Sequence, residues 1–204
     1  GHTAGISAGI REAHLHGAVS STSVMMNRPA ARQALSDAAR SCPKLGMGVH
    51  LVLTSGRPLS DPERIPSLVT PEGAFRREEP FIAHLPDLDP AHVWIEWNAQ
   101  VEQFIQITGH APDHLDSHHH SSYFTPVLFD SMLQLASKLS CAIRRPNWPR
   151  WDDAEMPAPY TPASIREMET LMEKVQPRTT AGFIGDFYDE GVSRSHLLEI
   201  LDAI

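Results

Sequence analysis

Segments typical of β-strands and segments typical of α-helices alternate along almost the whole chain. The clearest helix is expected over residues 89–108, where apolar residues recur at three- and four-residue intervals until Gly109 ends the pattern. Such alternation is typical of a parallel sheet with helices packed outside it, either as a barrel or as an open sheet. In both architectures a functional site forms at the carboxyl ends of the strands.

The other expected elements follow the same alternation. Strands are expected over 18–27, 47–54, 114–120, 140–144 and 179–184. Further helices are expected over 7–17, 29–40, 126–138, 161–175 and 193–204. Two segments rich in Pro, 55–86 and 145–159, interrupt the pattern. The first is too long for an ordinary connection, so we expect a functional loop that contacts the substrate or a small insertion.

The composition argues against several classes of protein. The 204 residues include 25 acidic and 17 basic ones, and no run of Lys or Arg could follow a phosphate backbone, so we expect no nucleic-acid partner. No apolar stretch approaches the ~20 residues that a transmembrane helix requires. The chain is long enough to bury a core, and residues 1–204 are expected to form one domain.

The two cysteines, Cys42 and Cys141, lie far apart and lack the spacing of a zinc site. We expect both to be reduced and structural, because a free Cys beside apolar or small residues is usually buried. We assign the protein to the cytoplasm, and a homodimer is compatible with the sequence.

Histidines mark two of the expected strands. His50 lies in an apolar segment, where its ring needs a polar partner, and taken alone it is more typical of a core residue than of a ligand. In the second segment, a strand period of two places Asp116, His118 and His120 on one face. Imidazole and carboxylate groups are ligands of divalent metal ions, and the alternative is a surface patch of histidines. We therefore expect the two strands to converge on one metal-centred hydrolytic site.

Other polar residues are open to two interpretations. Arg144 ends an expected strand, where it could hold a carbonyl or a developing oxyanion or form an ordinary ion pair. Asp152 and Asp153 lie near Trp148 and Trp151, which fits either a sugar-stacking platform or a solvated turn.

Four stretches, in order, resemble the YdjC-like carbohydrate deacetylases, the family of chitooligosaccharide (chitin disaccharide) deacetylases. They are 5–10 with Glu12, Ala13 and Gly17; Ser21–Asn27; Gly48–Thr54 with Pro58 and Leu59; and Pro112–His120. Ala142, Ile143 and Arg144 extend the resemblance. The string His-Leu-Asp-Ser-His-His-His is the most specific part, whereas Ser121 and Ser122 depart from the pattern that usually follows it.

The resemblance implies a TIM-barrel-like (β/α) barrel with fewer than eight strands and a divalent metal ion, Mg or Zn, held by one Asp and two His. His50 and His118 match the two histidines. The metal-binding Asp and the catalytic Asp belong to an Asp-Asp-[Phe/Tyr]-Gly motif whose last residue matches Gly1, so both are expected upstream of Gly1. We therefore expect this chain to lack the first strand and a C-terminal part, which includes a Cys-His-Pro segment beyond Ile204.

The resemblance implies metal-assisted hydrolysis of the N-acetyl group of an amino-sugar oligosaccharide. The ion would polarise the amide carbonyl, a carboxylate would accept the proton of the attacking water, and His120 would protonate the leaving amine. Arg144 is assigned a catalytic role, and Asn27 and Asp116 are assigned to substrate binding. Two alternatives stay open: a deacetylase acting on a lipid-linked sugar, and a catalytically incompetent metal- or sugar-binding module.

Overall fold

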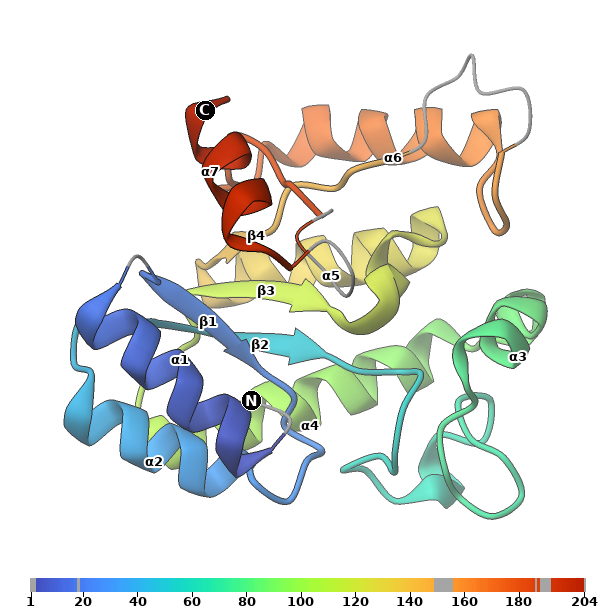
Figure 1. The fold of residues 1–204 in the computed structure, drawn as a ribbon. Coiled ribbons are helices and arrows are strands. Elements are labelled where there is room, and N and C mark those ends of the chain that lie inside the picture. The colour runs from blue at the N-terminus through green and yellow to red at the C-terminus, as the bar shows by residue number, and fades with distance from the viewer. Residues whose placement is uncertain (1–2, 18, 149–155, 186, 188–191, 204) are drawn as a thin grey trace.

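Four short parallel strands lie at the centre of the computed structural model, which describes residues 3–17, 19–148, 156–185, 187 and 192–203 (Figure 1). The strands are β1 (Ser21–Val24), β2 (Gly46–Leu51), β3 (His114–Ser117) and β4 (Ala142–Ile143). They form one sheet in the order β1-β2-β3-β4, and every neighbouring pair is parallel. The predicted parallel α/β architecture is therefore confirmed, whereas closure into a barrel stays a prediction.

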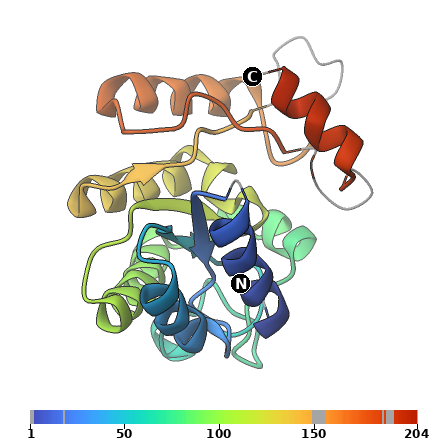
Figure 2. The same ribbon diagram turned by 60° about the vertical axis from the view of Figure 1, so that its left-hand side comes forward.

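Helices connect the strands and cover the sheet. They are α1 (Ala4–His16), α2 (Ala31–Ser41), α4 (Pro90–Thr108), α5 (Pro126–Leu139), α6 (Pro162–Val175) and α7 (Arg194–Asp202). Figures 1 and 2 show α1 and α2 on the β1 side of the sheet and α6 and α7 on the β4 side. Residues Val49, Leu51 and Leu115 are fully buried in the core, while His50, between two of them, is only partly buried. Strand alternation thus separates a core face from a face that carries polar side chains.

Helix α4 agrees closely with the prediction from its apolar period. The Asp89 side chain accepts a hydrogen bond from the Ala91 N–H at the start, and Gly109 ends the helix in the left-handed conformation, with φ of 80°. The carboxylate cap and the C-terminal glycine are typical helix boundaries. They explain why this element could be placed correctly from sequence.

Segment 55–86 is a small folded insertion, the second of the two expected alternatives. It contains two 3₁₀ turns, Pro62–Arg64 and Leu85–Asp87, and the short helix α3 (Glu78–Ala83). Its residues Ile65, Leu68 and Phe81 are fully buried. Figure 1 shows α3 beyond the carboxyl ends of β2 and β3, which places the insertion at the end of the sheet where the site was expected.

Several predicted elements differ from the structure. The strand expected over 114–120 ends at Ser117, and a 3₁₀ segment, η3 (His118–Tyr123), follows it. The strand expected over 179–184 reduces to one parallel bridge between Thr179 and Ile143. The strands expected over 18–27 and 140–144 are shorter than predicted. The single domain over 1–204 and the homodimer stay predictions.

The structure bears on two expectations from the composition, the state of the cysteines and the absence of a transmembrane helix. Cys42 and Cys141 are both free and buried, and burial raises the pKa of the Cys141 thiol to about 11. No helix in the described part of the chain is long and apolar enough to span a membrane.

Two buried side chains of α4 hold the chain where it leaves β2. Gln100 accepts a hydrogen bond from the Val52 N–H at 2.9 Å and donates one to the Val52 carbonyl at 2.8 Å. Glu96 accepts hydrogen bonds from the N–H groups of Leu59 and Ser60, at 3.0 and 2.9 Å. Because Val52, Glu96 and Gln100 are buried, these contacts fix the path between β2 and the insertion.

Gln100→Leu is expected to lower the free energy of unfolding by about 3 kcal/mol. Leucine fills a similar volume but leaves the N–H and the carbonyl of Val52 buried without partners, and each such group costs about 1–3 kcal/mol. Urea unfolding monitored by circular dichroism measures the change. The control is Gln106→Leu on the exposed side of α4, which should change stability by less than about 0.5 kcal/mol. Equal effects of the two substitutions would contradict this role of Gln100.

Candidate active site at the carboxyl ends of the strands

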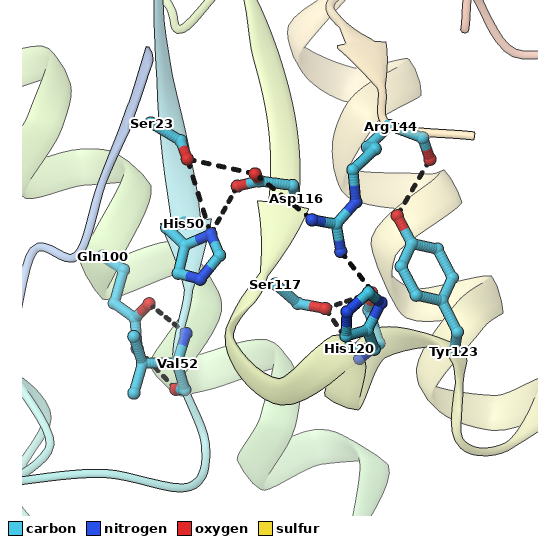
Figure 3. A network of polar contacts seen from close by, with 10 residues as sticks. Ser23, His50, Val52, Gln100, Asp116, Ser117, His120, Tyr123 and Arg144 are labelled. Atoms are coloured by element: carbon cyan, nitrogen blue, oxygen red, sulfur yellow. Dashed lines mark hydrogen bonds and ion pairs between the residues drawn. The ribbon is translucent and has the colours of Figure 1, made fainter. Parts of the chain in front are cut away.

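His50 and Asp116 are direct partners on adjacent strands, β2 and β3. The His50 Nδ1–H donates a hydrogen bond to Asp116 Oδ1 at 2.8 Å, and the Ser23 hydroxyl of β1 donates to Asp116 Oδ2 at 3.0 Å (Figure 3). Side chains from three strands therefore meet on the polar face of the sheet. The predicted convergence of His50 with the 114–120 segment is confirmed for Asp116.

Asp116 remains ionised despite its burial. Burial favours the neutral acid, but the hydrogen bond and charge of His50, with the charges of Arg144 and His114, outweigh it and hold the Asp116 pKa below its usual value. The Arg144 guanidinium lies 3.9 Å from Asp116 Oδ2. The site therefore contains one carboxylate that is bonded to His50 and lies near the Arg144 cation.

The Asp116 carboxylate also determines which nitrogen of His50 carries a proton. An ionised carboxylate can only accept hydrogen bonds, so Nδ1 of His50 must be the protonated nitrogen. In the neutral ring the lone pair then lies on Nε2. A carboxylate bonded to one nitrogen of a histidine whose other nitrogen is available is the arrangement found around many metal-binding histidines.

The histidine triplet is not part of a strand, so the predicted common face of Asp116, His118 and His120 is wrong. His119 and His120 adopt the left-handed conformation, with φ of 51° and 56°, and the chain turns away from the sheet. The turn nevertheless brings His118 to His50, with ring centroids 5.6 Å apart and the rings edge to face. The triplet thus reaches the site through a turn.

His120 lies on the other side of the site, against Arg144. A guanidinium nitrogen of Arg144 is 3.3 Å from His120 Nδ1 (Figure 3). Since a guanidinium can only donate, Nδ1 accepts this hydrogen bond and the neutral His120 ring carries its proton on Nε2. Burial first, and then the positive charge of Arg144, lower the His120 pKa, so the neutral ring is favoured.

Arg144 itself is held from two sides. Its guanidinium lies over the Phe183 ring, 4.4 Å from the ring centroid, and the Tyr123 hydroxyl donates a hydrogen bond to its carbonyl at 2.9 Å. Burial raises the pKa of Tyr123 to about 12, so this hydroxyl keeps its proton. Arg144 therefore forms an ion pair with Asp116 and also contacts His120, while its catalytic role stays a prediction.

Asn27 does not join these residues through its hydrogen bonds. Its amide donates to the carbonyls of Ser55 and Arg57, at 2.7 and 3.1 Å, and so holds the start of the insertion. Its assignment to substrate binding stays a prediction. Trp151, Asp152 and Asp153 lie outside the described residues, while Trp148 packs edge to face on Phe129.

Sequence reasoning missed Ser23, Tyr123 and Phe183 as parts of the site. Ser23 approaches Asp116 only because β1 lies beside β2 in the observed register. Tyr123 and Phe183 reach Arg144 from segments separated from it along the chain. No spacing in the sequence links these residues, so only the fold could identify them.

The donor atoms at the site include two of the groups that bind divalent metal ions in proteins. His50 and His118 provide two imidazoles, which suit Zn and related ions. Asp116 is bonded to His50 and orients that ring. Among the described residues no group of three or more His, Cys, Asp and Glu side chains is placed to hold an ion. The described part of the site therefore provides two imidazoles and a carboxylate that orients His50, and binding of a metal there stays a prediction.

Comparisons with known proteins identify relatives that match most of the chain. A carbohydrate deacetylase of Thermoanaerobacter pseudethanolicus is 33% identical over 204 residues, which cover 100% of this chain and 72% of that protein. A chitooligosaccharide deacetylase of Enterobacter sp. is 32% identical, with 96% and 68% covered. A crystal structure from Enterococcus faecalis V583, of a candidate cellobiose-phosphate cleavage protein, has a TM-score of 0.81 and 31% identity, and covers 100% of this chain and 71% of that one.

The family comparison extends over the same length. The sequence model described as YdjC-like protein matches residues 1–204, from one end of the chain to the other. The two relatives, each more than 30% identical, are named carbohydrate deacetylase and chitooligosaccharide deacetylase, and both names describe hydrolases. The resemblance expected from the His-Leu-Asp-Ser-His-His-His string is thereby confirmed, and the chain belongs to the YdjC-like family of carbohydrate deacetylases.

Proposed function

We propose that this protein hydrolyses the N-acetyl group of an amino-sugar oligosaccharide of the chitooligosaccharide type, with a divalent metal ion, Mg or Zn, bound by His50 and His118. The observation that carries the proposal is the Asp116–His50 pair facing His118, next to a neutral His120 that is held by Arg144. The names of the relatives support the reaction and the class of sugar.

Each of these residues would have a separate role in the reaction. Asp116 holds the Nδ1 proton of His50 and so presents the Nε2 lone pair toward the site. When bound, a divalent ion supplies Lewis-acid polarisation of the amide carbonyl and lowers the pKa of water. His50 and, to a smaller extent, Arg144 keep Asp116 ionised, and the Arg144 guanidinium also fixes the orientation of the His120 ring.

The role proposed for His120 is narrower than the one expected from sequence. A neutral ring with its proton on Nε2 can donate a hydrogen bond to the leaving nitrogen or to the carbonyl oxygen of the substrate. Full proton delivery would require the imidazolium form, which the burial of His120 and the charge of Arg144 disfavour. We therefore propose that His120 stabilises developing charge by hydrogen bonding.

Chelation of the metal is expected to abolish the activity. The full-length protein should release acetate from N,N'-diacetylchitobiose, lose this activity after treatment with EDTA, and regain it when Zn²⁺ or Mg²⁺ is added back, because the carbonyl would otherwise lack its Lewis acid. Acetate is quantified by proton NMR. Release of acetate at an unchanged rate after chelation, with metal content verified as negligible, would contradict the metal-dependent mechanism.

A further inference from the structure

His119, the middle residue of the triplet, is held by two residues from other parts of the chain. Its Nδ1 lies 3.1 Å from the Thr54 hydroxyl and 3.6 Å from a carboxylate oxygen of Glu78. Thr54 is 2% exposed and follows β2, the strand that carries His50. Glu78 is the first residue of α3 in the insertion. The contacts therefore join the triplet to the end of β2 and to the insertion.

The same ring packs against the proposed metal ligand. The rings of His118 and His119 are stacked, with centroids 3.9 Å apart and an interplanar angle of 26°. His118 in turn meets the His50 ring edge to face, at 5.6 Å. The position of the His119 ring therefore limits the angle that the His118 ring can take relative to His50.

The backbone at this point needs outside support. His119 and His120 are consecutive residues with positive φ, a conformation that a side chain with a Cβ atom disfavours. Such a turn persists only where surrounding contacts hold it. Thr54 and Glu78 provide these contacts for His119, as Arg144 does for His120.

We propose that Thr54 and Glu78 are positioning residues. They act through His119 to hold the His118 ring in its orientation relative to His50. The inference rests on the proposed role of His118 as a metal ligand. Under this proposal the insertion contributes to the site, because Glu78 would link the folding of segment 55–86 to the geometry of the metal ligands.

Thr54→Val tests the proposal with the Zn²⁺ dissociation constant, measured by competition with a chromophoric chelator. Valine keeps the shape of threonine and removes the hydroxyl, so the His119 ring loses its closest partner. We expect the dissociation constant to rise about tenfold, which is the lower end of the effect of losing an orienting residue around a metal. Thr54→Ser keeps the hydroxyl and should restore wild-type affinity.

Glu78→Gln is expected to weaken Zn²⁺ binding less than Thr54→Val, because its contact with His119 is longer. Glu79→Gln is its matched control, since Glu79 is the next residue of α3 and is exposed. The control should bind Zn²⁺ with wild-type affinity. If Thr54→Val does not fold, as judged by circular dichroism, His119→Asn replaces it, because Asn tolerates positive φ and lacks the stacking ring.

His118→Ala separates the two ways in which the account could fail. Weakened Zn²⁺ binding by His118→Ala, with wild-type binding by both Thr54→Val and His119→Asn, would overturn the positioning role alone. Wild-type Zn²⁺ binding by His118→Ala would instead contradict the proposed function on which the inference rests. Weakened binding by His118→Ala and Thr54→Val, with recovery in Thr54→Ser, is the result we expect.

Discussion

His118→Ala is expected to lower kcat/KM for acetate release from N,N'-diacetylchitobiose by on the order of 10³-fold. Loss of a residue that only orients a metal ligand already costs about 10–100-fold, and His118 is proposed as a ligand itself. The ring also stacks on His119 and faces His50, so its removal disturbs both neighbours. Steady-state kinetics of the full-length enzyme give the value.

The control for this prediction is His84→Ala. His84 lies in the insertion and pairs with Asp87, at 3.3 Å, so its replacement removes an imidazole without touching the site. This variant should keep kcat/KM within about twofold of the wild type. A His118→Ala enzyme that retained more than a tenth of the wild-type kcat/KM would contradict the proposed role of His118.

Asp116→Asn is expected to weaken Zn²⁺ binding by about 10–100-fold and to lower kcat/KM by a similar factor. Asparagine is nearly isosteric and can still accept the His50 Nδ1–H, but it lacks the charge that holds Arg144 and polarises His50. Metal competition and kinetics measure the two effects. Asp37→Asn on α2, where the carboxylate pairs with Arg11 and Arg40, is the charge-matched control and should change neither.

The pH dependence of stability provides a second test of Asp116. Its folded-state pKa lies below the ordinary value of 3.8, so the folded protein holds this proton less tightly than the unfolded chain. The ionised carboxylate therefore contributes stability above pH 3.8, and this contribution is lost as the pH falls through the folded-state pKa. The difference in unfolding free energy between wild type and Asp116→Asn should shrink below pH 3.8. A difference that grew on acidification would contradict the ion pairs described for Asp116.

Local signals in the sequence were sufficient for the longer helices and for the parallel sheet, but not for the short helix α3. Helix α4 combines an apolar period, an Asp cap and a terminal Gly, and each of these signals acts within a few residues. The strands were predicted too long, because an extended pattern in the sequence continues past the residues that pair with a neighbouring strand: β1 ends at Val24 and β3 at Ser117. The number of paired residues in a strand depends on the neighbouring strand, and a local sequence pattern carries no information about that neighbour.

The candidate site was predicted in part. His50 and Asp116 meet because both lie near the carboxyl ends of adjacent parallel strands, and this follows from the fold class. The common face of Asp116, His118 and His120 failed because a period of two presumes extended backbone, whereas His119 and His120 turn with positive φ. The contact of Thr54 with His119 could not be predicted from the sequence, since it depends on where the triplet turns.

The most direct test of the account is the position of a bound metal. Anomalous diffraction at the zinc edge, from crystals of the full-length protein grown with Zn²⁺, should show one ion bonded to His50 Nε2 and to a nitrogen of His118, at about 2.0–2.1 Å from each. Asp116 should remain bonded to His50 Nδ1 as it is here. An ion bound elsewhere, with His50 and His118 both free of it, would contradict the proposal that these histidines form a metal-centred deacetylase site.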